Sequence, residues 1–173
     1  MGWAMTIFAK IAMVLSWSYY TLFLGYHWGG QLLGLHNEIW EMYDFPVQQV
    51  SPPTWTILVG FLVSALTVLS LGIAYLSGWK ILDRSATENF RFLAQKLGTM
   101  AWGLIGFWIG YNVLSGAVQL LIAVDLSSTE GFDFGWDPLD FDIIFAITGV
   151  ILLAIARSLE RAWLAEDEVK HFL

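Results

Sequence analysis

The sequence predicts an all-α fold: a polytopic membrane protein, built as a four-transmembrane-helix bundle with an amphipathic helix at its outer interface. Of the 173 residues, 57% are hydrophobic and 13% are charged, whereas an ordinary soluble domain carries about 25% charged residues. Four long segments are also apolar throughout or nearly so. The length suits one compact unit, so we expect a single membrane domain over residues 1–173.

The four predicted spans cover approximately residues 3–26, 55–79, 98–124 and 141–164. A bilayer core of about 30 Å requires about 20 apolar residues in a helix, which each segment supplies or nearly supplies. Lys10 interrupts the first span, and the apolar run of the fourth ends at Arg157. The long Arg157 side chain can reach the interface while the helix continues.

The positive charges predict the orientation. All eight lysines and arginines lie near the N-terminus, between the second and third spans, or at the C-terminal end. The segments 27–54 and 125–140 contain none. Because cytoplasmic segments are enriched in lysine and arginine, we expect a multi-pass protein of the bacterial inner membrane with both termini in the cytoplasm.

The segments between spans suggest interfacial structure. Residues 31–45 alternate apolar and polar positions with helical periodicity, which predicts the outer amphipathic helix. This helix is either a lid over the bundle or a ligand-gating element. The acidic, aromatic segment 125–142 is either a solvated loop or a site for calcium or a cationic partner, but its spacing does not match a calcium-binding loop.

The third span has two faces that predict helix packing. Small residues mark close helix contacts in membranes, and polar side chains within a span usually face protein or water. One side carries Gly103, Gly106, Gly110 and Ala117, and the nearly opposite side carries Asn112, Ser115, Gly116 and Gln119. Either this helix sits centrally among the others, or one of its faces meets a second protein.

Candidate reaction chemistry is sparse. The chain has no cysteine, and no catalytic or metal-binding motif stands out, so we expect a protein that is not an enzyme and has no metal or resident cofactor. His27 and His36 are candidate tetrapyrrole ligands, although a hydrogen-bonding interfacial histidine is the alternative. Bound lipids are expected. The net charge of −7 argues against a nucleic-acid partner.

Two stretches carry a family resemblance: residues 87–98 (TENFRFLAQKLG) and 149–167 (GVILLAIARSLERAWLAED). With the spans around them, they resemble a bacterial family of uncharacterised four-helix membrane proteins, domain of unknown function two-nine-seven-five. The resemblance covers roughly residues 55–168, and the last five residues depart from it. It implies a fold and no activity, while the family's frequent proximity to small helix-turn-helix regulators hints at sensing. It also suggests a cytoplasmic contact among Glu88, Asn89, Arg91, Arg157 and Glu160.

These observations lead to one main functional hypothesis and two alternatives. The main hypothesis is an accessory or structural subunit, packed against other integral membrane subunits of a respiratory or photosynthetic complex. The first alternative is a membrane sensor or small-molecule handling protein, with a polar cavity that reaches Asn112 and Gln119. The second is a tetrapyrrole-binding membrane protein that uses His27 or His36.

Overall fold

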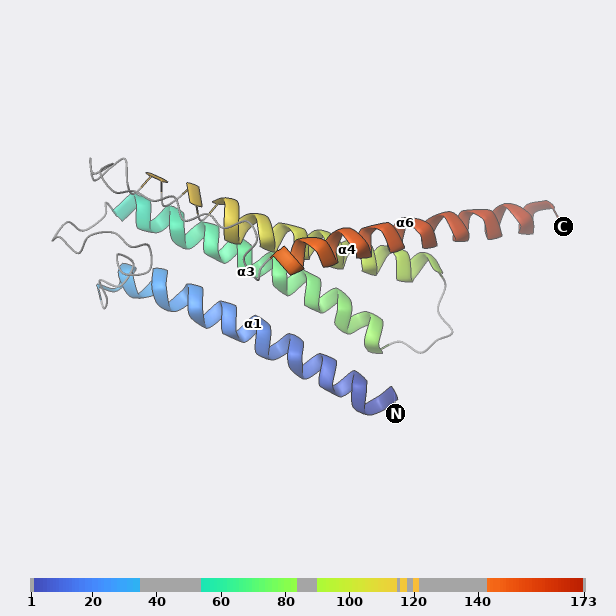
Figure 1. The fold of residues 1–173 in the computed structure, drawn as a ribbon, viewed down its shortest axis with the longest axis horizontal. Helices are drawn as coiled ribbons and strands as arrows, with labels where there is room; N and C mark the ends of the chain where they lie inside the picture. Colours follow the sequence, from blue (N-terminus) through green and yellow to red (C-terminus); the bar gives the residue numbers. More distant parts are fainter. Residues whose placement is uncertain are drawn as a thin grey trace.

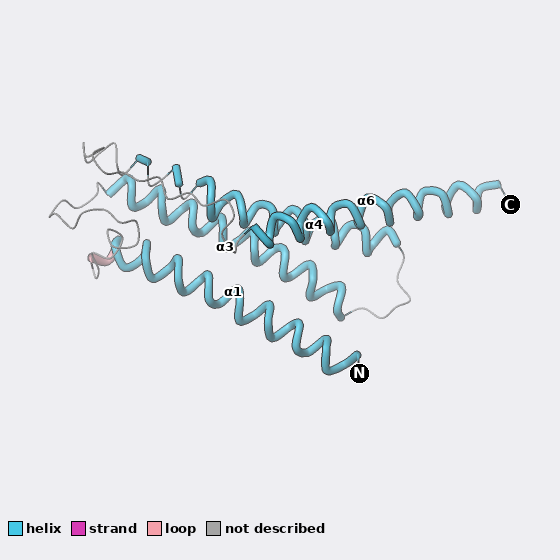
Figure 2. Tube along the Cα trace, viewed as in Figure 1, coloured by secondary structure: helices cyan, strands magenta, loops and turns pink. Residues whose placement is uncertain are grey.

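The computed structural model describes residues 2–34, 54–83, 90–114, 116–117, 120–121 and 143–172. Within these ranges the chain is helical apart from a turn at residues 33–34. The elements in chain order are α1 (Gly2–Leu32), α3 (Thr54–Asp83), α4 (Phe90–Trp108), the π-helical segment η1 (Ile109–Leu114) and α6 (Ile143–Phe172). Figures 1 and 2 show these long helices lying side by side. The predicted all-α class is therefore confirmed for the described residues.

Three helices are long and apolar enough to cross a membrane: Trp3–Leu32 of α1, Thr54–Asp83, and Ile143–Glu168 of α6. They contain the predicted spans 3–26 and 55–79 and nearly all of 141–164. The remaining predicted span, 98–124, falls on α4, η1 and residues outside the described ranges. α4 has 19 residues, and its first two turns carry Arg91 and Lys96, so the fourth crossing stays a prediction.

The helices form a row in the order α1, α3, α4, α6, each in contact with its neighbours in that row. Adjacent helices run antiparallel. Ser16 of α1 contacts Tyr75 of α3. Between α4 and α6, Gly98 lies next to Ala156, and Ala101 lies next to Gly149. The two termini consequently lie at the same end of the molecule (Figure 1). α4 lies between α3 and α6, which matches the expectation of a central helix with protein on two sides.

A face of small residues on α3 organises the packing. Its buried positions are largely small or polar and recur three or four residues apart, at Gly60, Ser64, Thr67, Leu71, Ala74 and Gly78. Thr67 satisfies its own hydroxyl by donating to the Val63 carbonyl at 2.8 Å. Most of the large apolar side chains of α3 instead point outward, as Leu62, Leu66 and Leu69 do. Short side chains let helices approach closely, which drives association in lipid.

The end of α1 corrects one prediction. Residues 31 and 32 belong to α1 and not to a separate interfacial helix. α1 ends because Gly34 adopts a left-handed conformation with φ of 67°, which favours glycine at helix ends. The Gly34 amide donates to the Gln31 carbonyl at 3.1 Å and closes this turn. The rest of the predicted outer helix, like the acidic segment 125–142, lies outside the described residues.

Candidate functional site

The predicted glycine face of α4 packs on α3. A methyl group at Gly103 would lie 2.8 Å from the Ala74 amide nitrogen and 2.9 Å from the Ala74 Cβ. One at Gly106 would lie 3.1 Å from the Ser70 hydroxyl oxygen, and one at Gly110 would collide with Thr67. Gly103 and Gly106 of α4 and Gly110 of η1 therefore let this helix approach the backbone of α3. Ala117, the last member of the predicted face, is exposed.

The opposite side of α4 packs on α6. A side chain at Gly149 of α6 would lie 2.9 Å from the Ala101 carbonyl oxygen and 2.7 Å from Ile105. Because Gly149 lies beside Ala101 and Ile105, α6 begins near the level of η1. In the described structure the backbone of α6 approaches α4 but not η1, where the second predicted face begins. On that face, the polar residues Ser115 and Gln119 lie outside the described residues, and the small residue Gly116 is buried.

Asn112 lies in η1, where the helix widens from α to π. Its side-chain amide donates to the Trp108 carbonyl oxygen at 3.1 Å. In a continued α-helix, the backbone amide of residue 112 would bond that same carbonyl. The side chain is half-buried and its amide is satisfied within its own helix. The cavities described below lie between α1 and α3, away from Asn112.

An aromatic cluster joins all four long helices and η1 at this level. Tyr20 of α1 makes edge-to-face contacts with Phe107, Tyr111 and Phe145, at centroid distances of 4.8 Å, 5.9 Å and 6.1 Å. Phe107 is fully buried and packs with Leu71 of α3. Such pairs prefer edge-to-face geometry because of the ring quadrupole. The cluster brings α1 against α4 and α6, although the α1 backbone is adjacent to α3 alone.

The α1–α3 contact also contains polar interactions. The Ser16 and Tyr75 hydroxyls lie 2.9 Å apart, and the Trp17 indole N–H donates to the Val68 carbonyl oxygen at 3.2 Å. Toward the C-terminal end of α1, the Trp28 ring is buried at 3% exposure. It lies over Gly60, where any side chain would collide with the ring. Residue 60 must therefore be glycine for Trp28 to seat on α3.

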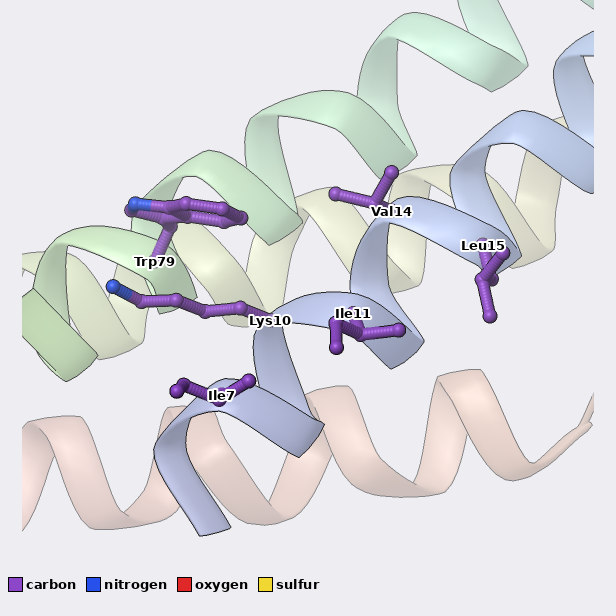
Figure 3. A pocket seen from close by; sticks show the side chains of 6 residues that line it. All are labelled: Ile7, Lys10, Ile11, Val14, Leu15 and Trp79. Atoms are coloured by element: carbon purple, nitrogen blue, oxygen red, sulfur yellow. The ribbon is translucent and has the colours of Figure 1, made fainter. Parts of the chain in front are cut away.

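The other end of this contact is ionic. Lys10 forms an ion pair with Asp83, the last residue of α3. Its ammonium also lies 4.7 Å from the centroid of the Trp79 ring, in a cation–π contact. Figure 3 shows the Lys10 side chain extended beside that ring. Lys10 therefore lies beside the last turn of α3, between Trp79 and Asp83, and Trp3 and Phe8 of α1 project beyond it with exposed side chains.

Two adjoining cavities lie along the same contact, with volumes of about 330 Å³ and 400 Å³. They share Val14 and Trp79 and form one open depression, hereafter the α1–α3 groove. Its lining is almost entirely apolar, with Trp17, Gly72 and Leu76 at the end farther from the N-terminus. Lys10 lines the end nearest the N-terminus. The groove is the candidate functional site in the described part of the chain.

Of the two candidate tetrapyrrole ligands, His27 lies within the described residues. The His27 Nδ1 lies 2.7 Å from the Phe23 carbonyl oxygen, and its ring packs 4.5 Å from the Phe23 ring centroid. An imidazole that donates through Nδ1 to its own helix leaves Nε2 as its acceptor atom. His36 lies outside the described residues. No group of three His, Cys, Asp or Glu side chains suited to a metal ion occurs within the described ranges.

The predicted cytoplasmic contact is only partly within the described ranges, since Glu88 and Asn89 lie outside them. Arg91 of α4 places its guanidinium 4.9 Å from the ring centroid of Trp163 on α6. Arg157 and Glu160 are exposed on α6. In the described residues, Arg91 thus reaches α6 through an aromatic ring that the sequence analysis did not single out.

Sequence reasoning missed the groove and the pairing of Trp28 with Gly60. Two signals point to them. Lys10 is the one lysine or arginine within α1, so an acidic partner at a helix end was to be expected. The small residues of α3 recur at intervals of four and three, which marks a packing face that hydropathy alone does not distinguish.

Comparison with known proteins adds no relative: no family model, curated protein or solved structure matches this chain. The resemblance to the family of domain of unknown function two-nine-seven-five therefore stays a prediction, carried by residues 87–98 and 149–167 alone.

Proposed function

We propose that this chain is a non-enzymatic accessory subunit, which docks through α1 onto another integral membrane protein of a larger respiratory or photosynthetic assembly. One observation carries the proposal. Gly25 and Gly29 form a second glycine pair at a spacing of four residues, on α1. No described atom outside the neighbouring helix backbone lies within 4 Å of the position of a Cβ at either glycine.

Gly25 and Gly29 differ from the packed glycines at positions 103 and 110 in having no close contact with a described neighbour. Gly103 and Gly110 are occupied by close contacts with α3, so this fold uses glycine where helices approach. Glycine in a helix interior costs about 1 kcal/mol relative to alanine. On α1 that cost is not offset by packing against any described neighbour. A partner transmembrane helix seated on Gly25 and Gly29 would supply the missing contact.

The test uses native-gel migration and mass spectrometry after mild detergent extraction from the protein's own membranes. The wild-type chain is expected in a larger complex, and the Gly25→Ile/Gly29→Ile double variant is expected to migrate as a small species. Ala4→Ile is the matched control, because Ala4 is also exposed on α1. Wild-type protein that migrates alone would contradict the proposal, as would a double variant that stays in the complex.

The sensor alternative is favoured by η1. π-helical turns within α-helices frequently occur at functional sites, and Asn112 places a polar side chain there. Under this alternative, Asn112→Ala and Gln119→Ala would each abolish a ligand response measured in cells. A change in stability without a change in response would exclude it.

The tetrapyrrole alternative rests on His27, whose Nδ1 contact with Phe23 would orient Nε2 for ligation. A visible absorption scan of the protein purified from its own membranes decides it. A Soret band that His27→Ala removes would support this alternative, and a colourless protein would exclude it.

A further inference from the structure

We propose that the α1–α3 groove binds a phospholipid whose headgroup carries both a phosphate and a primary ammonium, as phosphatidylethanolamine does. This site is independent of the glycine pair proposed above for docking, because it occupies the opposite half of α1. It is argued from the shape of the groove, its apolar lining and the order of charges at its end.

The groove fits an acyl chain. Its two cavities have volumes of about 330 Å³ and 400 Å³, and their walls are nearly all apolar. They run along α1 from Ile7 to Ser18 and along α3 from Gly72 to Trp79. Gly72 leaves room at the inner part of the groove, where a methyl group would lie 3.1 Å from the Trp17 indole nitrogen. An open, elongated apolar groove on a membrane helix pair faces lipid chains by its position.

The charged end of the groove lies at a membrane boundary. The segment of α3 from Thr54 to Trp79 carries no charge, and Lys80 and Asp83 follow it. Trp79 lies at this boundary and lines the groove, at the level where indole rings are enriched in membrane proteins. A lipid with its chain in the groove would consequently place its headgroup beside Lys10 and Asp83.

The order of these two charges matches the order of charges in the headgroup. Lys10 lines the groove, whereas Asp83 follows Trp79 by one helical turn and its side chain is 50% exposed. In phosphatidylethanolamine the phosphate is nearer the acyl chains and the ammonium is farther out. An ammonium has three donors, so Lys10 can hold a phosphate oxygen as well as Asp83. Asp83 can in turn accept from the lipid ammonium.

The experiment is native mass spectrometry of the full chain in detergent, titrated separately with phosphatidylethanolamine, phosphatidylcholine and phosphatidylglycerol of identical acyl chains. We expect tightest binding of phosphatidylethanolamine, because choline lacks N–H donors and phosphatidylglycerol lacks a cation for Asp83. Lys10→Gln should weaken that binding about tenfold, as for the loss of a charged hydrogen bond. Equal binding of all three lipids would overturn the proposal, as would a preference for phosphatidylglycerol.

Two further variants separate lipid binding from folding. Val14→Trp fills the groove and should weaken binding of every lipid, whereas Leu66→Trp adds the same side chain at an exposed position of α3 outside it. The exchange of Lys10→Asp with Asp83→Lys keeps the ion pair but reverses the order of charges. It should retain helical content by circular dichroism and lose the preference for phosphatidylethanolamine. Retention of that preference by the exchange variant, or unaltered binding by Val14→Trp, would overturn the site.

Discussion

At the scale of single residues, the same amino acid has opposite consequences on two helices. Gly103 faces the Ala74 backbone, which cannot move aside without displacing α3, whereas Gly25 faces no described neighbour. Alanine is the better helix former by about 1 kcal/mol. At Gly103 this gain is outweighed by overpacking, which typically costs about 1–3 kcal/mol. At Gly25 nothing opposes the gain.

We therefore expect Gly103→Ala to lower the free energy of unfolding by about 1–2 kcal/mol. Gly25→Ala should leave it unchanged or raise it by up to about 1 kcal/mol. Reversible unfolding of the purified chain in mixed micelles measures both. Equal effects of the two substitutions would contradict the packing of α4 on α3.

At the scale of elements, α1 and α6 are the end helices of the row, and the contact of α1 with α3 is less extensive than that of α6 with α4. Trp28 over Gly60 is the most deeply buried large contact of α1. Removing the indole leaves a cavity, and cavities cost stability in proportion to their volume. In lipid this cavity cost is the main contribution, because acyl chains are as apolar as a helix interface and burial of an apolar side chain adds little stability.

Trp28→Ala should consequently lower the free energy of unfolding by about 2–3 kcal/mol and detach α1 before the other helices. Hydrogen exchange followed by mass spectrometry should show earlier exchange in residues 2–32 than in α4. Trp102→Ala is the matched control, because Trp102 is 61% exposed on α4 and loses only lipid contact. Uniform destabilisation of all helices by Trp28→Ala would show that α1 is not a separate unit.

At the scale of the whole molecule, the antiparallel row brings both termini to the end that holds the Lys10–Asp83 pair. The chain has no cysteine, so single-cysteine variants report topology without background. With a membrane-impermeant maleimide, Leu33→Cys should be labelled in intact cells with a permeable outer envelope. Glu168→Cys, beyond the predicted fourth span, should be labelled only after the inner membrane is opened, since both termini are expected in the cytoplasm. Labelling of both variants from the same side would refute the predicted orientation.

Much of the architecture followed from the sequence for one physical reason. Crossing a bilayer requires long apolar helices, so hydropathy alone locates α1, α3 and α6. Hydropathy does not orient a helix that is apolar all round, as α3 is. The face that α3 buries became evident only from its neighbours, and that face carries serine, threonine and glycine, while most leucines of α3 are exposed.

The sequence by itself determined the helical class, the approximate position of three spans and the small-residue face of α4, because each depends on local composition. Only the tertiary structure decided that Gly149 seats α6 on α4, that Trp28 requires glycine at position 60, and that Lys10 meets Asp83. Those pairings join residues far apart in the chain, and they depend on the antiparallel alignment of neighbouring helices. The alignment is set by the fit of side chains between helices, which no single helix encodes.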